Sequence, residues 1–113
     1  MARAIWKDVV IAESDDTIRL EGNHYFPSGS IVTEHFRPSE KTSVCPWKGV
    51  ASYYDIQVGD AVNHGAAWYY PDPSAAASQI TGYVAFWKGV KIVGDDPTSG
   101  GRVRGVVERL RGR

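Results

Sequence analysis

The chain has 113 residues, the length of one ordinary domain with a single hydrophobic core. Hydrophobic residues make up 42% of it, and 13 Lys and Arg balance 13 Asp and Glu, which excludes a disordered polyelectrolyte and a uniformly basic nucleic-acid coat. The single cysteine, Cys45, excludes an intramolecular disulfide, and no apolar run approaches the ~18 residues of a membrane span. Because the N-terminus has acids where a signal peptide needs an apolar stretch, we expect a cytoplasmic protein that does not enter a membrane.

The first half of the chain predicts antiparallel strands, since short apolar or alternating segments are separated by pairs of turn-forming residues. Residues 9–12 and 17–21, with an aspartate pair between them, predict a hairpin. Residues 50–58 alternate in polarity and predict a strand that ends in a Gly-Asp turn at residues 59–60. We therefore expect an all-β fold that is mainly antiparallel.

The second half continues this pattern with one helical exception. Residues 73–78 begin with Pro and Ser and favour a short helical turn. Residues 83–87 and 90–93, separated by a Lys-Gly pair, predict another hairpin. Residues 1–94 are thus expected to form a single compact β domain.

The end of the chain differs in composition. Residues 95–101 contain Gly, Asp, Pro, Thr and Ser without an apolar anchor and predict a linker. Residues 102–113 hold five arginines against one glutamate, a local charge of +4, and predict a basic amphipathic helix. Its apolar stripe is formed by Val103, Val106, Val107 and Leu110. The stripe either docks on the β domain or on a second copy, giving a homodimer, or leaves the charged tail free to engage nucleic acid, an acidic protein surface or anionic lipid.

Six blocks of sequence occur in order within residues 3–93. They are Ala12-Glu13-Ser14, Gly22-Asn23-His24-Tyr25-Phe26-Pro27, Cys45-Pro46-Trp47-Lys48-Gly49, Ala51-Ser52-Tyr53-Tyr54, Ala66-Ala67-Trp68-Tyr69-Tyr70-Pro71 and Gly82-Tyr83-Val84-Ala85-Phe86. In these blocks the chain resembles a bacterial family named domain of unknown function 427, also called nucleotidyltransferase domain 9. The resemblance implies a compact, β-tent-like domain in which two antiparallel sheets pack at a steep angle.

The resemblance brings neither a metal nor a reaction. Many relatives of the β-tent group hold zinc with four cysteines, whereas this chain has only Cys45. The sequence also lacks a Gly-Ser loop followed by spaced carboxylates, and it lacks a phosphate-binding Gly-x4-Gly-Lys-Ser/Thr loop. We therefore predict no cofactor and no metal, and the sequence leaves open whether the protein is an enzyme.

Aromatic residues are concentrated in the middle of the chain, where residues 25–87 hold 12 of the 13 rings. The rings either fill a small β core or line a cleft in which a flat ligand stacks. Alternation along strands separates the central rings into two sets that cannot face one core, Tyr53 with Tyr69, and Tyr54 with Trp68 and Tyr70. Some of these rings are therefore expected to be exposed.

The block Cys45–Gly49 combines a thiol, a proline, a large ring and a cation. Lys48 beside Cys45 favours the thiolate, which makes Cys45 a candidate reactive thiol, although a lone cysteine is more often a small buried apolar residue. Lys48 is also a candidate anion clamp.

Three histidines are candidates for polar chemistry. His24, His35 and His64 lack the spacing of a helix-borne metal site, although they would form a mixed site if they converged with Cys45 or Glu21. His24 is the best candidate for a catalytic acid or base because it lies in a turn-rich segment at a strand end.

Two functions follow from these patterns. The first is binding of a planar or anionic small metabolite in a cleft formed by Tyr25, Trp47, Lys48, Tyr53, Trp68 and Tyr70. The alternative is a protein or nucleic-acid interaction module that uses exposed rings and the basic tail. Nucleic acid is the less favoured partner, because arginines without interleaved aromatics form a generic electrostatic patch.

Overall fold

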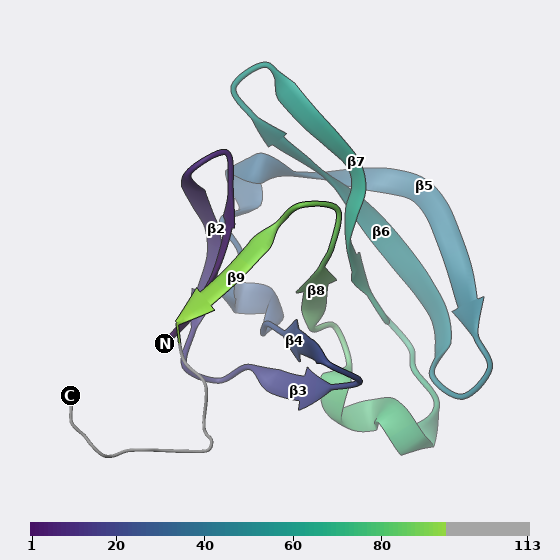
Figure 1. The fold of residues 1–113 in the computed structure, drawn as a ribbon. Helices are drawn as coiled ribbons and strands as arrows, with labels where there is room; N and C mark the ends of the chain where they lie inside the picture. Colours follow the sequence, from purple (N-terminus) through teal and green to yellow (C-terminus); the bar gives the residue numbers. More distant parts are fainter. Residues whose placement is uncertain (95–113) are drawn as a thin grey trace, which may run out of the picture.

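The computed structural model describes residues 1–94, and the predicted linker (95–101) and arginine-rich helix (102–113) lie outside the described residues. The described chain forms nine strands and three 3-10 helices (Figure 1). The strands are β1 (Ala2–Trp6), β2 (Val9–Ser14), β3 (Ile18–Leu20), β4 (Asn23–Tyr25), β5 (Phe36–Cys45), β6 (Gly49–Val58), β7 (Ala61–Tyr69), β8 (Val84–Phe86) and β9 (Lys91–Gly94). The 3-10 helices are η1 (Ser28–Ser30), η2 (Thr33–His35) and η3 (Ala75–Ile80).

The strands form three sheets with the orders β2-β1-β9, β3-β4 and β5-β6-β7-β8, and every ladder in them is antiparallel. The predicted all-β, mainly antiparallel class is confirmed, and the two larger sheets are joined by a third, two-stranded one. Phe26, directly after β4, exchanges two backbone hydrogen bonds of 2.8 Å with Val84 in β8. Figure 1 shows the small sheet beside β8 and η3.

The hairpin predicted between residues 9–12 and 17–21 is wrong. The first of these segments lies in β2, which pairs with β1, whereas β3 pairs with β4. The β1–β2 turn is formed by Lys7 and Asp8, whose φ angles of 53° and 63° match a two-residue turn with both central residues in the left-handed region. A Lys-Asp pair suits such a tight turn, whereas the aspartates at residues 15–16 lie between β2 and β3, which do not pair with each other.

The hairpin predicted around residues 88–89 is also wrong in its pairing. A turn does occur there, since Lys88 and Gly89 have φ angles of 55° and 86°, and the Val90 N–H donates to the Trp87 carbonyl at 3.3 Å. However, β8 pairs with β7, and β9 crosses to the other large sheet and pairs with β1. Turn residues indicate a change of direction, whereas the partner of each strand is chosen by tertiary packing.

Other local predictions are confirmed. β6 covers the alternating segment and is followed by a turn at residues 59–60, with Gly59 at a φ of +58°. The predicted helical turn corresponds to η3, which begins two residues later than the proline-serine pair suggested. None of the helices in residues 1–94 has the length and apolar character needed to span a membrane.

The two faces of the four-stranded sheet belong to different apolar clusters. One cluster joins this sheet to the three-stranded sheet, with buried members Ala2, Ala4, Ile11, Ala12, Phe26, Phe36, Ile56, Ala66, Ala67, Val84 and Phe86. The other lies toward the small sheet and η3, with buried members Tyr25, Ala51, Tyr70, Ala77, Ile80 and Ala85. Consecutive residues of β8 alternate between them, because side chains of a strand point to opposite faces.

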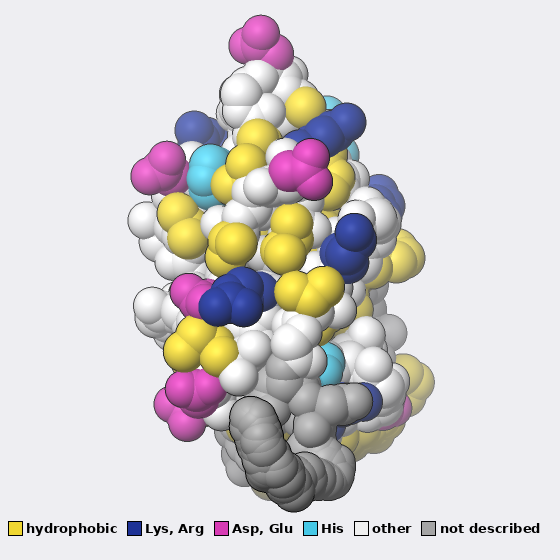
Figure 2. Space-filling model, turned by 60° about the vertical axis from the view of Figure 1, so that its left-hand side comes forward, with side chains coloured by type: hydrophobic (Ala, Val, Ile, Leu, Met, Phe, Trp, Pro, Cys, Tyr) yellow, Lys and Arg dark blue, Asp and Glu magenta, His cyan; other side chains and the backbone are white. Residues whose placement is uncertain are grey.

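The outer surface around the three-stranded sheet is mixed in character. On the side of the molecule where β2 lies, apolar side chains are interspersed with charged groups of both signs (Figure 2). Scattered apolar residues of this kind are ordinary on a protein surface. The side chains with the most distinctive arrangement lie instead on the second face of the four-stranded sheet.

Candidate functional site

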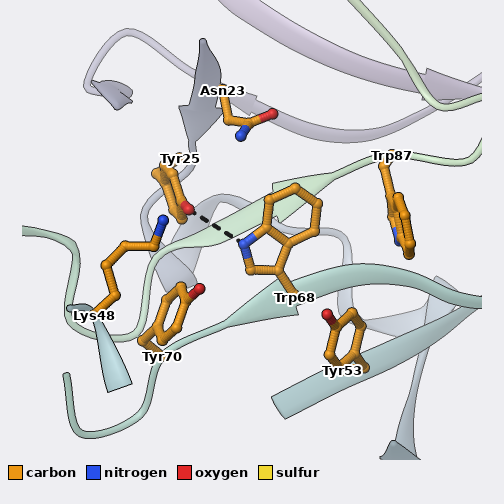
Figure 3. Close-up of a pocket in the computed structure, with 7 residues that line it drawn as sticks. All are labelled: Asn23, Tyr25, Lys48, Tyr53, Trp68, Tyr70 and Trp87. Atoms are coloured by element: carbon orange, nitrogen blue, oxygen red, sulfur yellow. Dashed lines mark hydrogen bonds between the residues drawn. The ribbon is translucent and has the colours of Figure 1, made fainter. Parts of the chain in front are cut away.

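An aromatic cleft of about 170 Å³ lies where β6, β7 and the segment after β8 approach the small sheet (Figure 3). It is lined by Asn23, Tyr25, Lys48, Tyr53, Trp68, Tyr70 and Trp87. Five of the six residues predicted to bind a ligand are among them, and the sixth, Trp47, lies just outside and contacts Lys48. Trp87 and Asn23 were not predicted.

The pairing of β6 with β7 decides which rings face the cleft. Tyr53 is opposite Trp68, so these two rings share the cleft face, while Tyr54 is opposite Ala67 and shares the other face with Tyr69. The expected grouping of Tyr53 with Tyr69 is therefore wrong, because the sequence does not give the register between the strands, and a shift of one residue exchanges the faces.

A bulge interrupts this ladder next to the cleft. Pairing shifts between Tyr54 and Ile56, and the Gly65 N–H donates to Asp55 Oδ1 at 2.7 Å. Gly65 has a φ of +64°, a backbone conformation that glycine adopts without steric cost. Its carbonyl accepts a 2.7 Å hydrogen bond from Trp87 Nε1, which holds the Trp87 ring at the edge of the cleft.

Trp68 occupies the centre of the cleft. Its ring meets Tyr25 and Trp87 edge-on, with centroid separations of 6.2 Å in both cases. Its Nε1 donates to the Tyr25 hydroxyl at 3.2 Å, as the dashed line in Figure 3 shows. Edge-to-face contacts are the favoured geometry for aromatic pairs, and they leave the faces of these rings available on other sides.

Lys48 lies at one end of the cleft and is buried, with 6% of its surface exposed. Its Nζ forms an ion pair with Glu21 and lies 5.1 Å and 5.6 Å from the ring centroids of Trp47 and Tyr70. The Ser74 N–H donates to the Lys48 carbonyl at 2.9 Å and anchors the end of the β5–β6 hairpin. A buried ammonium requires such partners.

Glu21 supplies the counter-charge from the turn between β3 and β4. Its carboxylate accepts hydrogen bonds from Lys48 Nζ and, at 3.2 Å, from Trp47 Nε1. Glu21 and Gly22 have φ angles of 52° and 81°, which form a tight two-residue turn. A non-glycine residue such as Glu21 is uncommon in the left-handed region of backbone conformation. From the sequence, Glu21 was considered as part of a mixed zinc or general-base site, and its pairing with Lys48 needs a contact across 27 sequence positions.

The ion pair sets the protonation of both partners. The hydrogen bond from Lys48, with a second from Trp47, holds the pKa of Glu21 below its usual value. Burial by itself lowers the pKa of Lys48, but the hydrogen bond to Glu21 and the charge interactions with Tyr25, Tyr70 and Cys45 together outweigh it, so the net shift is upward. Both groups are therefore charged at neutral pH. Burial raises the pKa of Tyr25 and of Tyr70, so their hydroxyls stay protonated.

Cys45 lies at the end of β5, half-buried against the apolar cluster behind the cleft. Burial raises the pKa of its thiol, but backbone N–H groups of Trp47 and Lys48 and the Lys48 charge outweigh this, so the net shift is downward. The thiol is outside the cleft lining, and its reactivity stays a prediction.

The histidines occupy separate places. His24 contacts Thr17 through Nδ1 at 3.2 Å and is not part of the cleft lining. His35 Nδ1 lies 2.9 Å from the Gln57 carbonyl, and His64 lies 3.4 Å from Asp55. Within residues 1–94, no three His, Cys, Asp or Glu side chains are grouped as ligands for a metal ion. The structure thus does not assemble the mixed histidine site considered from the sequence.

A family model described as Domain of unknown function (DUF427) matches residues 1–96, which include all the described strands. No curated protein matches the chain. The family description names neither a ligand nor a reaction. Since the match covers most of the chain and agrees with the six sequence blocks, this protein belongs to the DUF427 family.

Proposed function

We propose that this domain binds a small planar metabolite in the aromatic cleft. The observation that carries the proposal is the convergence of five aromatic side chains with one amide and one buried ammonium, from segments far apart in the sequence. Small-molecule sites are typically concave, mainly apolar, and supplied with a few polar groups that fix the ligand's orientation.

The size of the cleft limits the ligand. A cavity of ~150 Å³ accommodates a benzene-sized molecule, and this cleft measures about 170 Å³. One ring therefore fits inside, and any remaining part of the ligand must extend into solvent. Of a nucleoside triphosphate only the base would lie inside, so the cleft by itself gives no support to the name nucleotidyltransferase.

The polar groups can orient such a ring. Asn23 offers an amide, and Tyr25 and Tyr70 offer hydroxyls that remain protonated because burial raises their pKa values. The charge of Lys48 is already matched by Glu21, so this end of the cleft favours hydrogen bonding over binding of a free anion. Because His24 is absent from the lining, the geometry supports binding rather than acid-base catalysis.

Native mass spectrometry of gently purified full-length protein is the first test, because a stoichiometric adduct gives the mass of the ligand. The matched pair Trp68→Phe and Tyr69→Phe then locates the site. Trp68 faces the cleft and Tyr69 faces the packed side of the same strand. We expect at least fivefold weaker binding of the identified ligand for Trp68→Phe and no change for Tyr69→Phe; equal affinities would refute the cleft.

Self-association, with a second copy of the chain as the protein partner, is a second candidate function, favoured by the exposed end of the β5–β6 hairpin. Val44 and Val50 form a cross-strand pair with exposed fractions of 75% and 51%, and Trp47 between them is 40% exposed. Apolar side chains grouped in this way are a feature of interaction surfaces. Sedimentation velocity of full-length protein and of Val44→Lys tests self-association, which we expect only for the unaltered chain.

A further inference from the structure

A second lysine lies at the opposite end of the cleft from Lys48. Figure 3 shows Tyr53 and Trp87 on one side of Trp68, with Lys48 and Tyr70 on the other. Lys41 Nζ lies 4.8 Å from the Tyr53 ring centroid and 5.2 Å from the Trp87 ring centroid. The ammonium of Lys41 is therefore in contact with two lining rings at the rim.

The backbone directs Lys41 to this position. Pairing between β5 and β6 is interrupted between Pro38 and Thr42, so Lys41 lies in an irregular part of the edge strand. Lys41 Cδ lies 3.4 Å from the point where a Cβ on Gly65 would be. The bare surface of Gly65 thus accommodates the aliphatic part of Lys41, while the Gly65 carbonyl holds Trp87 beside it.

The two ends of the cleft differ in charge balance. Lys48 is paired with Glu21, whereas Lys41 forms no salt bridge with any acid in residues 1–94. Lys41 is also exposed, so an incoming anion reaches it without removal of a protein partner. A cation resting on aromatic faces beside an open cleft is suited to a ligand that combines a ring with an acidic group.

We infer that Lys41 is the anion-binding residue of this cleft and that the ligand is a one-ring aromatic acid whose acidic group lies at the Lys41 rim. This inference rests on the proposed binding function and specifies its ligand class. The sequence suggested Lys48 as the anion-binding residue. We assign this role to Lys41 instead, because an anion at Lys48 would have to compete with Glu21. A cationic ring would instead meet repulsion from Lys41.

The test uses full-length protein and three probes of equal ring size: benzoate, benzamide and benzamidine, which are anionic, neutral and cationic at pH 7. Probes of about nine heavy atoms bind in the millimolar range, so affinities are read from NMR titrations. The signals are the indole N–H resonances of Trp68 and Trp87, assigned with Phe variants. We expect benzoate to bind about fivefold tighter than benzamide, which corresponds to about 1 kcal/mol, and benzamidine to bind weakest.

Lysine variants test which residue produces the preference for benzoate over benzamide. We expect Lys41→Met to bind benzoate and benzamide equally, with the benzamide affinity unchanged, and Lys41→Arg to retain the preference for benzoate. Lys88→Met is the matched control, because Lys88 Nζ also lies over Trp87, at 5.4 Å, but donates to the His64 carbonyl at 2.9 Å. This control should bind all three probes as the unaltered protein does.

The outcomes separate the inference from the binding function. If benzamide binds and benzoate has no advantage, or if Lys41→Met keeps the preference, the role of Lys41 is wrong while the cleft remains a binding site. Tightest binding of benzamidine would also overturn the inference. If no probe shifts the Trp68 signal, both the inference and one-ring binding in this cleft are refuted. Dispersed NMR signals for Lys41→Arg establish that the site tolerates substitution.

Discussion

The two faces of the four-stranded sheet carry similar aromatic residues and use them differently. On the packed face, Tyr54 stacks on Tyr69 at 4.8 Å and meets the edge of Phe36 at 5.5 Å, beneath the three-stranded sheet. On the cleft face, Trp68 contacts its neighbours edge-on and a space of about 170 Å³ is left beside it.

The difference comes from what covers each face. The packed face is closed by a whole sheet of three strands, whereas the cleft face is met by a two-stranded sheet and the 3-10 helix η3. A two-stranded sheet is too small to bury a row of tryptophan and tyrosine rings completely. The same residue types therefore form core on one side and a candidate site on the other.

The strongest way to test this contrast is to truncate neighbouring side chains on the two faces. Phe86 is 6% exposed and contacts Phe26 and Phe36, whereas Trp87 is 44% exposed at the cleft. We expect Phe86→Ala to lower the free energy of unfolding by about 3–5 kcal/mol through lost burial and a cavity. Urea denaturation followed by circular dichroism measures this loss.

Trp87→Ala is the comparison for that experiment. It removes the hydrogen bond to the Gly65 carbonyl and an exposed ring, so we expect a loss of about 1 kcal/mol. If the two substitutions destabilised the domain equally, the distinction between a packed face and an open one would be wrong.

A smaller effect should come from the backbone at the edge of the cleft. Gly65→Ala places a side chain on a residue with φ of +64° and 3.4 Å from Lys41 Cδ, and we expect a loss of about 1–2 kcal/mol in the free energy of unfolding. The indole N–H resonance of Trp87 reports whether the Lys41 contact is displaced, because Lys41 Nζ lies 5.2 Å from the Trp87 ring centroid.

Two glycine controls separate the cost of the positive φ from the cost of the contact with Lys41. Gly59→Ala shares the positive φ, at +58°, but has no atom within 4 Å of the new Cβ. Gly29→Ala has neither constraint, so it should raise the free energy of unfolding by up to about 1 kcal/mol rather than lower it. A loss at Gly65 no larger than the loss at Gly59 would show that contact with Lys41 adds nothing.

The smallest expected effect is the pH dependence of the stability that the Glu21–Lys48 ion pair contributes. The pKa of Glu21 is held below its usual value of 4.5, so the ion pair stabilises the fold above pH 4.5, and this contribution is lost as the pH falls through the folded pKa. The raised pKa of Lys48 keeps the Lys48 ammonium charged throughout this range. We expect the urea midpoint to fall between about pH 5 and pH 3.

In Glu21→Gln, the urea midpoint should decrease less at acidic pH than in the unaltered protein. Glu40→Gln is the control, because Glu40 is exposed and forms no ion pair with the other described residues. Identical pH profiles for Glu21→Gln and the unaltered protein would contradict a stabilising Glu21–Lys48 pair.

The candidate site was predictable in its residue types more than in its geometry. The clustering of rings and the Cys45–Gly49 block identified most of the lining, since large aromatics beside a cation are rare enough to stand out. Lys41 and Asn23 carried no such signal, because single polar residues between strands are ordinary. Trp87 was assigned to a strand end without a role, and its part in the cleft depends on the bulge at Gly65.

The sequence by itself determined the antiparallel β class, the positions of most turns and the family, because alternation and turn residues are local properties read within a few positions. Only the tertiary structure decided the partners of β2, β8 and β9, the faces of Tyr53 and Tyr69, and the pairing of Lys48 with Glu21. These features depend on register and on contacts between distant segments. Each is selected by the burial of whole faces, which no local pattern encodes.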